Sequence, residues 1–176
     1  MITGITLCLM FALPQQGGSD LLASKNAEAA RAITAEFGLD DWSGKLVDRS
    51  LLSATSVDGK SDLLLARCDV LRMVAGRKLD ELERLDALGE AGEAYSVYLD
   101  GNPSSSRATK AQSNLGTLAF IYGQTLVQLI NSGGIGSDHL IKASEQAEGI
   151  FKAALSGMNS VISWWEALSA DDPEKA

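Results

Sequence analysis

Basic charge, histidine, cysteine and proline are all scarce in this chain of 176 residues. Fifteen Lys and Arg residues stand against 23 Asp and Glu residues, and no basic block is present that would neutralise several phosphates. We therefore expect no nucleic-acid partner for this acidic protein. The chain has three prolines and few runs of β-branched residues, and such a sequence disfavours a β-sheet. Its length is that of one domain. The composition predicts an all-α fold.

Residues that carry catalysis or bind metals are also sparse. The single histidine, His139, has no cysteine or second histidine nearby, so we interpret it as a solvated residue near a helix start. The glycine-rich residues 133–136 follow a predicted helix rather than a strand, and they lack the Lys-Ser/Thr pair of a phosphate-binding loop. Serine-nucleophile and zinc-protease motifs are absent from the sequence. We expect no enzyme activity, no metal and no cofactor.

The N-terminus carries one short apolar run, residues 5–13, followed by Pro14 and a pair of glycines. This run is too short to span a bilayer, and no integral membrane span is expected. Its length fits a secretory signal peptide, although the basic residues that usually precede such a run are missing. Residues 1–18 are therefore either a signal peptide of a periplasmic or secreted protein or an unstructured N-terminal segment of a cytoplasmic one. Their removal would leave Cys68 as the sole cysteine, in an apolar setting that predicts a buried thiol.

Apolar residues at steps of three and four predict six or seven helices. The expected helices cover, to within a residue or two, 19–37, 46–54, 61–76, 80–101, 104–131, 137–157 and 160–170. Residues 40–44 and 57–60 are expected to be turns, and residues 174–176 a frayed tail. The first helix is expected to bury the face that carries Leu22, Ala29, Ile33 and Phe37. The third is expected to be buried rather than half-exposed.

Two glycines and two tryptophans lie inside these helices. Glycine in a helix interior costs about 1 kcal/mol relative to alanine, so Gly116 and Gly149 call for a compensating reason. Close approach of two helices is the simplest one, with Phe151 or Tyr122 filling the remaining space, and the alternative is a loosely packed bundle. Trp164 and Trp165 point about 100° apart on a helix, so either one ring is partly exposed or the two pack on different neighbours.

Two segments resemble the tetratricopeptide repeat family. Asn114-Leu115-Gly116, with Gly123, resembles the signature of the first helix of a repeat, and the later Ala-x-x-x-Phe-x-x-Ala resembles that of the second helix. The residues expected to pack within the repeats are Ala91, Tyr95, Pro103, Leu115, Gly116, Gly123, Ala147, Phe151 and Ala154. The resemblance is clearest over residues 61–173. Tyr95 and Phe151 are 56 residues apart, whereas regular repeats recur at about 34 residues, so an irregular stack is expected.

The resemblance implies antiparallel helical hairpins stacked as a short, irregular right-handed solenoid, a single helical-repeat domain over residues 19–173. It further implies a non-catalytic scaffold that binds another protein or a peptide on the concave side of the first helices. The candidate peptide-binding face is Lys110, Ser113, Asn114, Thr117 and Ile121. Lys110 would hold a ligand carboxylate, and Asn114 would bind a ligand backbone through two hydrogen bonds. The alternative is a self-associating structural protein, a homo-oligomer without a peptide groove.

Overall fold

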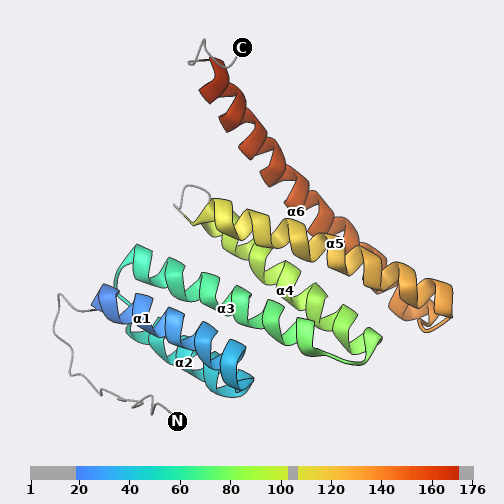
Figure 1. Ribbon diagram of the computed structural model, residues 1–176, viewed down its shortest axis with the longest axis horizontal. Coiled ribbons are helices and arrows are strands. Elements are labelled where there is room, and N and C mark those ends of the chain that lie inside the picture. The colour runs from blue at the N-terminus through green and yellow to red at the C-terminus, as the bar shows by residue number, and fades with distance from the viewer. Residues whose placement is uncertain (1–18, 103–106, 171–176) are drawn as a thin grey trace, which may run out of the picture.

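The computed structural model describes residues 19–102 and 107–170, and every element in these ranges is a helix (Figure 1). The elements are α1 (Ser19–Ala32), the short π-helix η1 (Ile33–Phe37), α2 (Asp40–Ser53), α3 (Val57–Arg77), α4 (Glu81–Gly101), α5 (Ala108–Ser132) and α6 (Ser137–Ala170). Helices that follow one another along the chain pack against one another. The predicted all-α stack is therefore confirmed in this part of the chain, while its right-handed sense stays a prediction.

Several predictions fall outside the described residues. They concern the N-terminal segment 1–18, the repeat-packing residue Pro103 and the tail 174–176. The backbone of α6 is described as far as Ala170, but the side chains of Trp164 and Trp165 are not.

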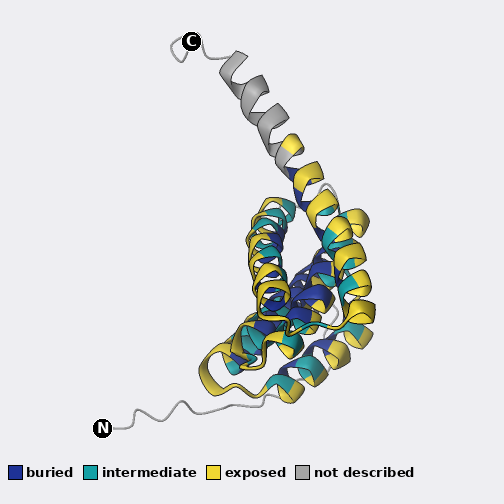
Figure 2. Ribbon diagram, turned by 90° about the vertical axis from the view of Figure 1, so that its right-hand side faces the viewer, coloured by how far each residue is buried: buried dark blue, intermediate teal, exposed yellow. Residues whose placement is uncertain are grey.

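Helix α3 lies at the centre of the stack, between α1 and α2 on one side and α4 on the other. It supplies Leu63 and Val70 to an apolar core shared with α1 and α2. It supplies Leu65 and Cys68 to a second core, shared with α4, α5 and α6. Figure 2 shows buried parts of the chain in dark blue on the inner side of the stack and exposed parts in yellow on its outer faces. The prediction of a buried third helix is confirmed.

Local capping sets several helix ends where the sequence predicts them. The side chain of Asp80 accepts hydrogen bonds from the backbone N–H groups of Leu82 and Glu83, at 3.0 and 2.9 Å, and thereby starts α4. Gly38 ends η1 and Gly133 ends α5, each in the left-handed conformation that glycine adopts without strain.

Three predicted boundaries are wrong. Residues 40–44, expected as a turn, begin α2, and residues 57–60, also expected as a turn, form the first turn of α3. Ser56 caps α3, because its hydroxyl accepts a hydrogen bond from the N–H of Gly59 at 2.9 Å. Gly157 does not end α6, which continues to Ala170. A Cβ at Gly157 would overlap the side chain of Gln112 on α5, so this glycine serves a close contact between helices.

Helix α1 buries alanines instead of the large side chains that were expected. Ala23, Ala27 and Ala30 are buried, whereas Leu22 is 41% exposed and Phe37 is 60% exposed. The predicted buried face of the first helix is therefore wrong. Small side chains allow α1 to lie close to α3, the helix with which it makes its largest contact.

Close approach of helices does occur, but not at Gly116 or Gly149. A Cβ at Gly116 or Gly149 would meet nothing within 4 Å, so helix packing does not require glycine at either position. Two close approaches lie on α4, at Gly89 and Gly92, where a Cβ would lie 2.9 and 2.7 Å from side-chain atoms of α6. The interpretation of Gly116 as a packing glycine is therefore corrected.

The remaining repeat-packing residues are distributed between the core and its rim. Ala91, Tyr95, Leu115 and Ala154 are buried, and Ala147 is half-buried against the same core. Phe151 is 40% exposed and lies over Gly123, where a Cβ would be 3.0 Å from its Cζ atom. Phe151 therefore covers the edge of the α5–α6 hairpin, and the fully buried ring of Tyr122 occupies its interior.

Candidate functional site

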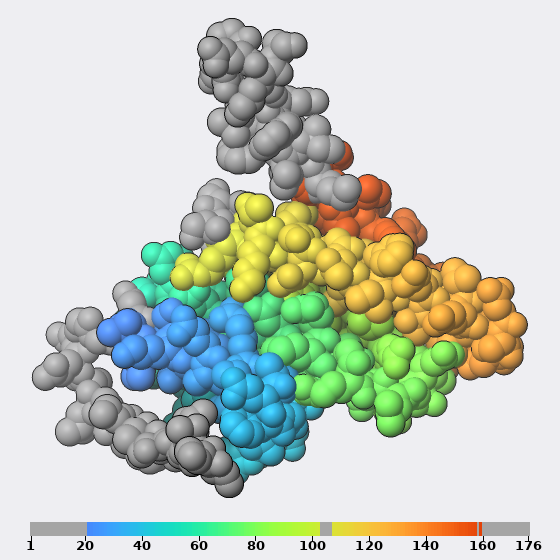
Figure 3. Space-filling view, in the orientation of Figure 1, coloured from blue at the N-terminus to red at the C-terminus, as the bar shows by residue number. Residues whose placement is uncertain are grey.

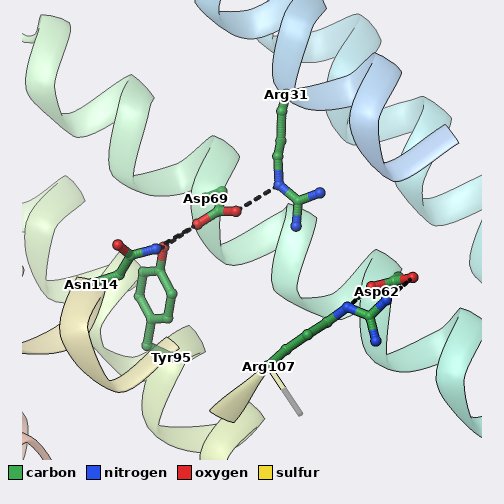
Figure 4. Close-up of polar contacts among 6 residues, drawn as sticks. All are labelled: Arg31, Asp62, Asp69, Tyr95, Arg107 and Asn114. Carbon is green, nitrogen blue, oxygen red and sulfur yellow. Dashed lines mark hydrogen bonds and ion pairs between the residues drawn. The ribbon is translucent and has the colours of Figure 1, made fainter. Parts of the chain in front are cut away.

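A buried carboxylate, Asp69, joins four helices (Figure 4). Asp69 lies on α3 and is 3% exposed. It accepts hydrogen bonds from Arg31 Nε on α1 at 2.6 Å, from Tyr95 Oη on α4 at 2.5 Å and from Asn114 Nδ2 on α5 at 3.0 Å. A buried charge is tolerated only when it is paired and hydrogen-bonded, and here both carboxylate oxygens have partners.

The Tyr95 hydroxyl is held in its protonated, donating form. Burial raises its pKa most, and the charge of Asp69 and the hydrogen bond to Asp69 raise it further, against a smaller lowering by Arg72. Tyr95 therefore donates to Asp69 at any physiological pH. The contact is structural rather than a proton-transfer pair.

A second polar bridge joins α3 to the start of α5. Arg107 directly precedes α5, and its Nη2 donates a hydrogen bond to Asp62 Oδ2 at 2.8 Å, while its Nε contacts the other carboxylate oxygen. Asp62 and Asp69 are two helical turns apart and share one face of α3. One face of α3 thus holds α5 at two points, through a bidentate ion pair and through the amide of Asn114 (Figure 4).

Four of the five candidate peptide-binding residues are exposed on α5. The fifth, Asn114, is half-buried, and its amide nitrogen donates to Asp69 and also to Tyr95 Oη, at 3.2 Å. These two acceptors lie only 2.5 Å apart, so they face the same side of the amide group, and the expected pair of hydrogen bonds from Asn114 to a ligand backbone stays a prediction. The exposed members are Lys110, Ser113, Thr117 and Ile121.

The exposed side of α5 is open in the part of the chain that the structure describes. Figure 3 shows the surface of α5, yellow to orange, lying beside α1 and α3 without being covered by them. The steps from Lys110 through Ser113 and Thr117 to Ile121 are three, four and four residues, which places the four side chains in one row. We call Lys110, Ser113, Thr117 and Ile121 the α5 row.

Sequence reasoning did not predict the hydrogen bonds and ion pairs that Asp62 and Asp69 of α3 make with residues outside this helix. The available signal was a pair of aspartates, Asp62 and Asp69, on one face of the third helix beside apolar residues, where acidic side chains are rarely buried without partners. Their partners Arg31, Asn114 and Arg107 lie 38 to 45 residues away along the chain. No local pattern connects residues at such separations.

Other groups that were singled out lie apart from this site or inside the core. Burial, and next the charge of Asp69, raise the pKa of the Cys68 thiol to about 12, so this cysteine is protonated at neutral pH. His139 is exposed near the start of α6. Within the described ranges, no three His, Cys, Asp or Glu side chains gather as a metal site would require. None of the described helices has both the length and the apolarity of a bilayer-crossing segment.

A shallow hollow of about 620 Å³ lies between α4 and α6, on the side where Gly89 and Gly92 allow close packing. Its charged lining mixes both signs, with Glu93 and Asp100 on α4 and Lys142 on α6. A lining with both signs of charge favours neither an anionic nor a cationic ligand.

Comparison of the chain with protein-family models found no match, and comparisons with curated proteins and with solved structures found no significant similarity. The resemblance to tetratricopeptide repeats therefore stays a prediction that rests on the residues alone.

Proposed function

We propose that this protein is a non-catalytic scaffold that binds another protein or a peptide along α5. The observation that carries the proposal is the α5 row. Its side chains are exposed, and hydrogen bonds and an ion pair attach the helix that bears them to α3. Ile121, 38% exposed, offers an apolar contact, and Ser113 and Thr117 offer hydroxyl groups. Lys110 offers a positive charge, which favours a partner segment that combines a carboxylate with an apolar side chain.

Rigidity of the binding helix supports this function. Asn114 binds Asp69 and Arg107 binds Asp62, and these contacts attach α5 to α3. The backbone that carries the α5 row is therefore already ordered before a ligand binds. Binding costs less free energy when the contacting side chains lie on a rigid element. The Thr117 hydroxyl donates to the backbone oxygen of Ser113 at 3.1 Å, which leaves its oxygen available as an acceptor toward solvent.

A random peptide library displayed on phage and selected on the full chain tests the proposal. We expect selected peptides to contain an acidic and an apolar residue, and to lose roughly tenfold or more in affinity, about 1.4 kcal/mol, with the Lys110→Glu variant. Lys152→Glu is the matched control, because Lys152 is an exposed lysine on α6, outside the row. Equal losses with both variants, or the same binding to the Ile121→Asp variant as to the wild type, would exclude the α5 row.

The location of the scaffold depends on residues 1–18, which lie outside the described residues. We propose that they direct export. The N-terminal residue of the mature protein, read by Edman degradation or mass spectrometry, tests this. A mature chain that starts close to Ser19 supports export, and an intact Met1 in the cytoplasmic fraction contradicts it.

A further inference from the structure

Arg72 differs from the other charged side chains that follow the first turn of α3. Each of those forms an ion pair: Asp62 with Arg107, Arg67 with Asp48, Asp69 with Arg31 and Arg77 with Asp40. Arg72 forms no ion pair with any residue that the structure describes. One positive charge on α3 is therefore left without a partner in the described part of the chain.

The guanidinium of Arg72 lies partly inside the stack, next to the Asp69 cluster. Arg72 is half-buried, and its Nε atom is buried without a hydrogen-bond partner among the described residues. The guanidinium lies beside the Tyr95 hydroxyl, because its hydrogen bonding and its charge oppose the rise in the Tyr95 pKa that burial and Asp69 cause. A buried donor without a partner is rare in native proteins, and here it points to a group that the chain itself does not supply.

The register of α3 against α5 places Arg72 level with Thr117 of the α5 row. Two polar contacts between these parts of the chain join residues 45 positions apart, Asp62 with Arg107 and Asp69 with Asn114. An equal separation in both contacts means that α3 and α5 run side by side in the same direction, and three residues further on Arg72 comes opposite Thr117. Arg72 therefore lies beside the α5 row.

Asn114 connects Arg72 to this row. Its Nδ2 atom lies 3.2 Å from Tyr95 Oη, the hydroxyl that the Arg72 guanidinium also approaches (Figure 4). We call Arg72 and Asn114 together the Arg72 subsite. Lys110, at the start of the row, lies seven residues before the level of Arg72, which is about 10 Å along α5 at 1.5 Å per residue.

Positive charge is in excess between α3 and the α5 row. Lys110 is the only Lys, Arg, Asp or Glu residue of α5. Asp62 and Asp69 are each paired with an arginine, so they do not compensate Lys110 or Arg72. Two positive charges thus remain here in a chain whose formal net charge is −8. A local field of this sign favours an anionic ligand.

We propose that the partner of the α5 row carries two side-chain carboxylates, one bound by Arg72 and the other by Lys110. This inference rests on the proposed function of the α5 row and names the chemistry of the partner. In a polyproline II segment, residues three positions apart lie on the same side and about 9 Å apart, which fits the separation of the two cations. The expected segment therefore has acidic residues at both ends of a four-residue stretch.

The two cations contribute in different ways. Guanidinium has five N–H donors in a planar fork that matches the two oxygens of a carboxylate, and Tyr95 Oη can accept only one of those donors. The ammonium group of Lys110 is exposed and acts as a point charge without a fixed geometry. A phosphate is less suited to this site, because proteins bind phosphorylated segments with clusters of arginines, and Arg72 is a single guanidinium.

Nuclear magnetic resonance of the isotope-labelled full chain tests the Arg72 subsite without the partner. The buried Nε–H group of Arg72 supplies a local signal. We expect this signal to shift and reach saturation on titration with N-acetyl-aspartate amide at constant ionic strength. N-acetyl-asparagine amide is the matched neutral probe and should leave the signal in place. An Arg72 signal that does not respond to the aspartate probe overturns the proposal.

Arg72→Gln tests the contact with the partner, using acidic peptides selected on the wild-type chain. Arg67→Gln is the matched control, because Arg67 lies on the same helix and its side chain is 56% exposed. We expect roughly tenfold or more loss of peptide affinity with Arg72→Gln and none with Arg67→Gln. Arg72→Lys should restore only part of the affinity, because lysine lacks the planar fork. Equal losses with the two glutamine variants contradict the proposal.

Double-mutant cycles assign each peptide carboxylate to its cation. Replacement of one acidic residue of the peptide by its amide should cause no further loss of affinity in Arg72→Gln, and replacement of the other none in Lys110→Gln. Selected peptides with a single acidic residue contradict the pair of carboxylates.

The thermal midpoint of the free protein separates binding from a structural role of Arg72. We expect Arg72→Gln to keep or raise this midpoint, since it removes a half-buried charge without a partner. A lowered midpoint together with unchanged peptide affinity shows a structural role and overturns the proposal.

The Arg72 subsite and the α5 row can fail separately. Peptides that depend on Lys110 but not on Arg72 reject the Arg72 subsite and leave the α5 row as the binding surface. A saturable response of Arg72 to the aspartate probe, with no selected peptide that depends on Lys110 or Ile121, rejects the α5 row and leaves Arg72 as a carboxylate site.

Discussion

The two halves of the molecule bury very different side chains around the helix they share, α3. Most of the core between α1, α2 and α3 is small, with Ala23, Ala27, Ala30, Ala54 and Ala66 among its members. The core between α3, α4, α5 and α6 contains much larger side chains, including Leu85, Leu88, Tyr95, Leu115, Leu118 and Tyr122. Hydrophobic stabilisation grows with the apolar area removed from water, by about 25 cal/mol per Å². The N-terminal half therefore gains less from burial and depends more on other contacts.

Polar groups are also satisfied differently in the two halves. In α2 the buried hydroxyls of Ser43 and Ser50 donate to backbone oxygens one turn earlier, at 3.1 and 2.6 Å. At Asp69, by contrast, the partners come from three other helices. The Arg31–Asp69 ion pair is thus a strong polar link between the alanine-rich half and the rest. The comparison suggests that this link matters more for α1 than for α5, which has a large apolar interface of its own.

Removing the charge of Asp69 should have the largest effect. Asp69→Asn leaves Arg31 facing a neutral amide, and loss of one partner of a buried pair costs about 3–5 kcal/mol of unfolding free energy. Urea denaturation measures the loss. Asp48→Asn is the control, because Asp48 pairs with Arg67 at 3.6 Å on the surface, where such pairs contribute about 0–1 kcal/mol. Equal losses for the two variants would show that burial of Asp69 has no energetic consequence.

Two fully buried leucines compare the two cores directly. Leu118→Ala on α5 should cost about 3–5 kcal/mol, and Leu63→Ala on α3, among alanines and valines, about 2–3 kcal/mol. The cost rises with the cavity that remains, and large neighbours leave a larger one. Urea midpoints of both variants decide the matter. A greater loss of unfolding free energy for Leu63→Ala than for Leu118→Ala would contradict the proposed difference between the two cores.

Removal of one tyrosine hydroxyl tests how strong the hydrogen bond to Asp69 is relative to a hydrogen bond between neutral groups. Tyr95→Phe removes the 2.5 Å hydrogen bond to Asp69 and should cost about 1–3 kcal/mol, since the remaining acceptor is charged and buried. Tyr98→Phe removes a neutral hydroxyl contact with Ser61, at 2.9 Å, and should cost about 0.5–1.5 kcal/mol. Thermal unfolding followed by circular dichroism measures both. A larger loss for Tyr98→Phe would show that the Asp69 cluster is not the stronger polar link.

The last effect expected is a gradual loss of stability in alkali, which arises from two buried groups of the C-terminal core. Burial raises the pKa of Cys68 from 9.0 and that of Tyr122 from 10.0, each to about 12. Because the folded state favours the neutral forms, this stability is complete below about pH 9 and is lost as pH rises through about 12. Urea midpoints between about pH 8 and pH 11 measure it. Tyr122→Phe should flatten part of the dependence, and a wild-type profile without any slope would refute the explanation.

Sequence reasoning was most accurate where a few neighbouring residues decide the structure. The start of α4 at Asp80 and the ends at Gly38 and Gly133 follow from caps whose atoms lie within a few residues. It failed at residues 40–44 and 57–60 because acidic and serine residues begin helices as well as turns. It failed at Gly157 because the missing side chain there makes room for Gln112, which lies 45 residues away along the chain.

The candidate site divides in the same way. Helical spacing alone predicts that Lys110, Ser113 and Thr117 share one side of a helix, and the structure places them exposed on that side. The role of Asn114 was not predictable, because its partners Asp69 and Tyr95 lie 45 and 19 residues away. The proposed function of the α5 row rests on the side chains that remain exposed after this packing.

The sequence by itself determined that the chain is helical and where most helices begin or end, because capping and apolar periodicity act over three or four residues. Only the tertiary structure decided that α1 buries alanines, that Gly89 and Gly92 rather than Gly116 lie against another helix, and that Asp69 joins four helices. The physical reason is distance along the chain. Contacts between helices depend on which surfaces come together, and that choice minimises the free energy of the whole core rather than of any one segment.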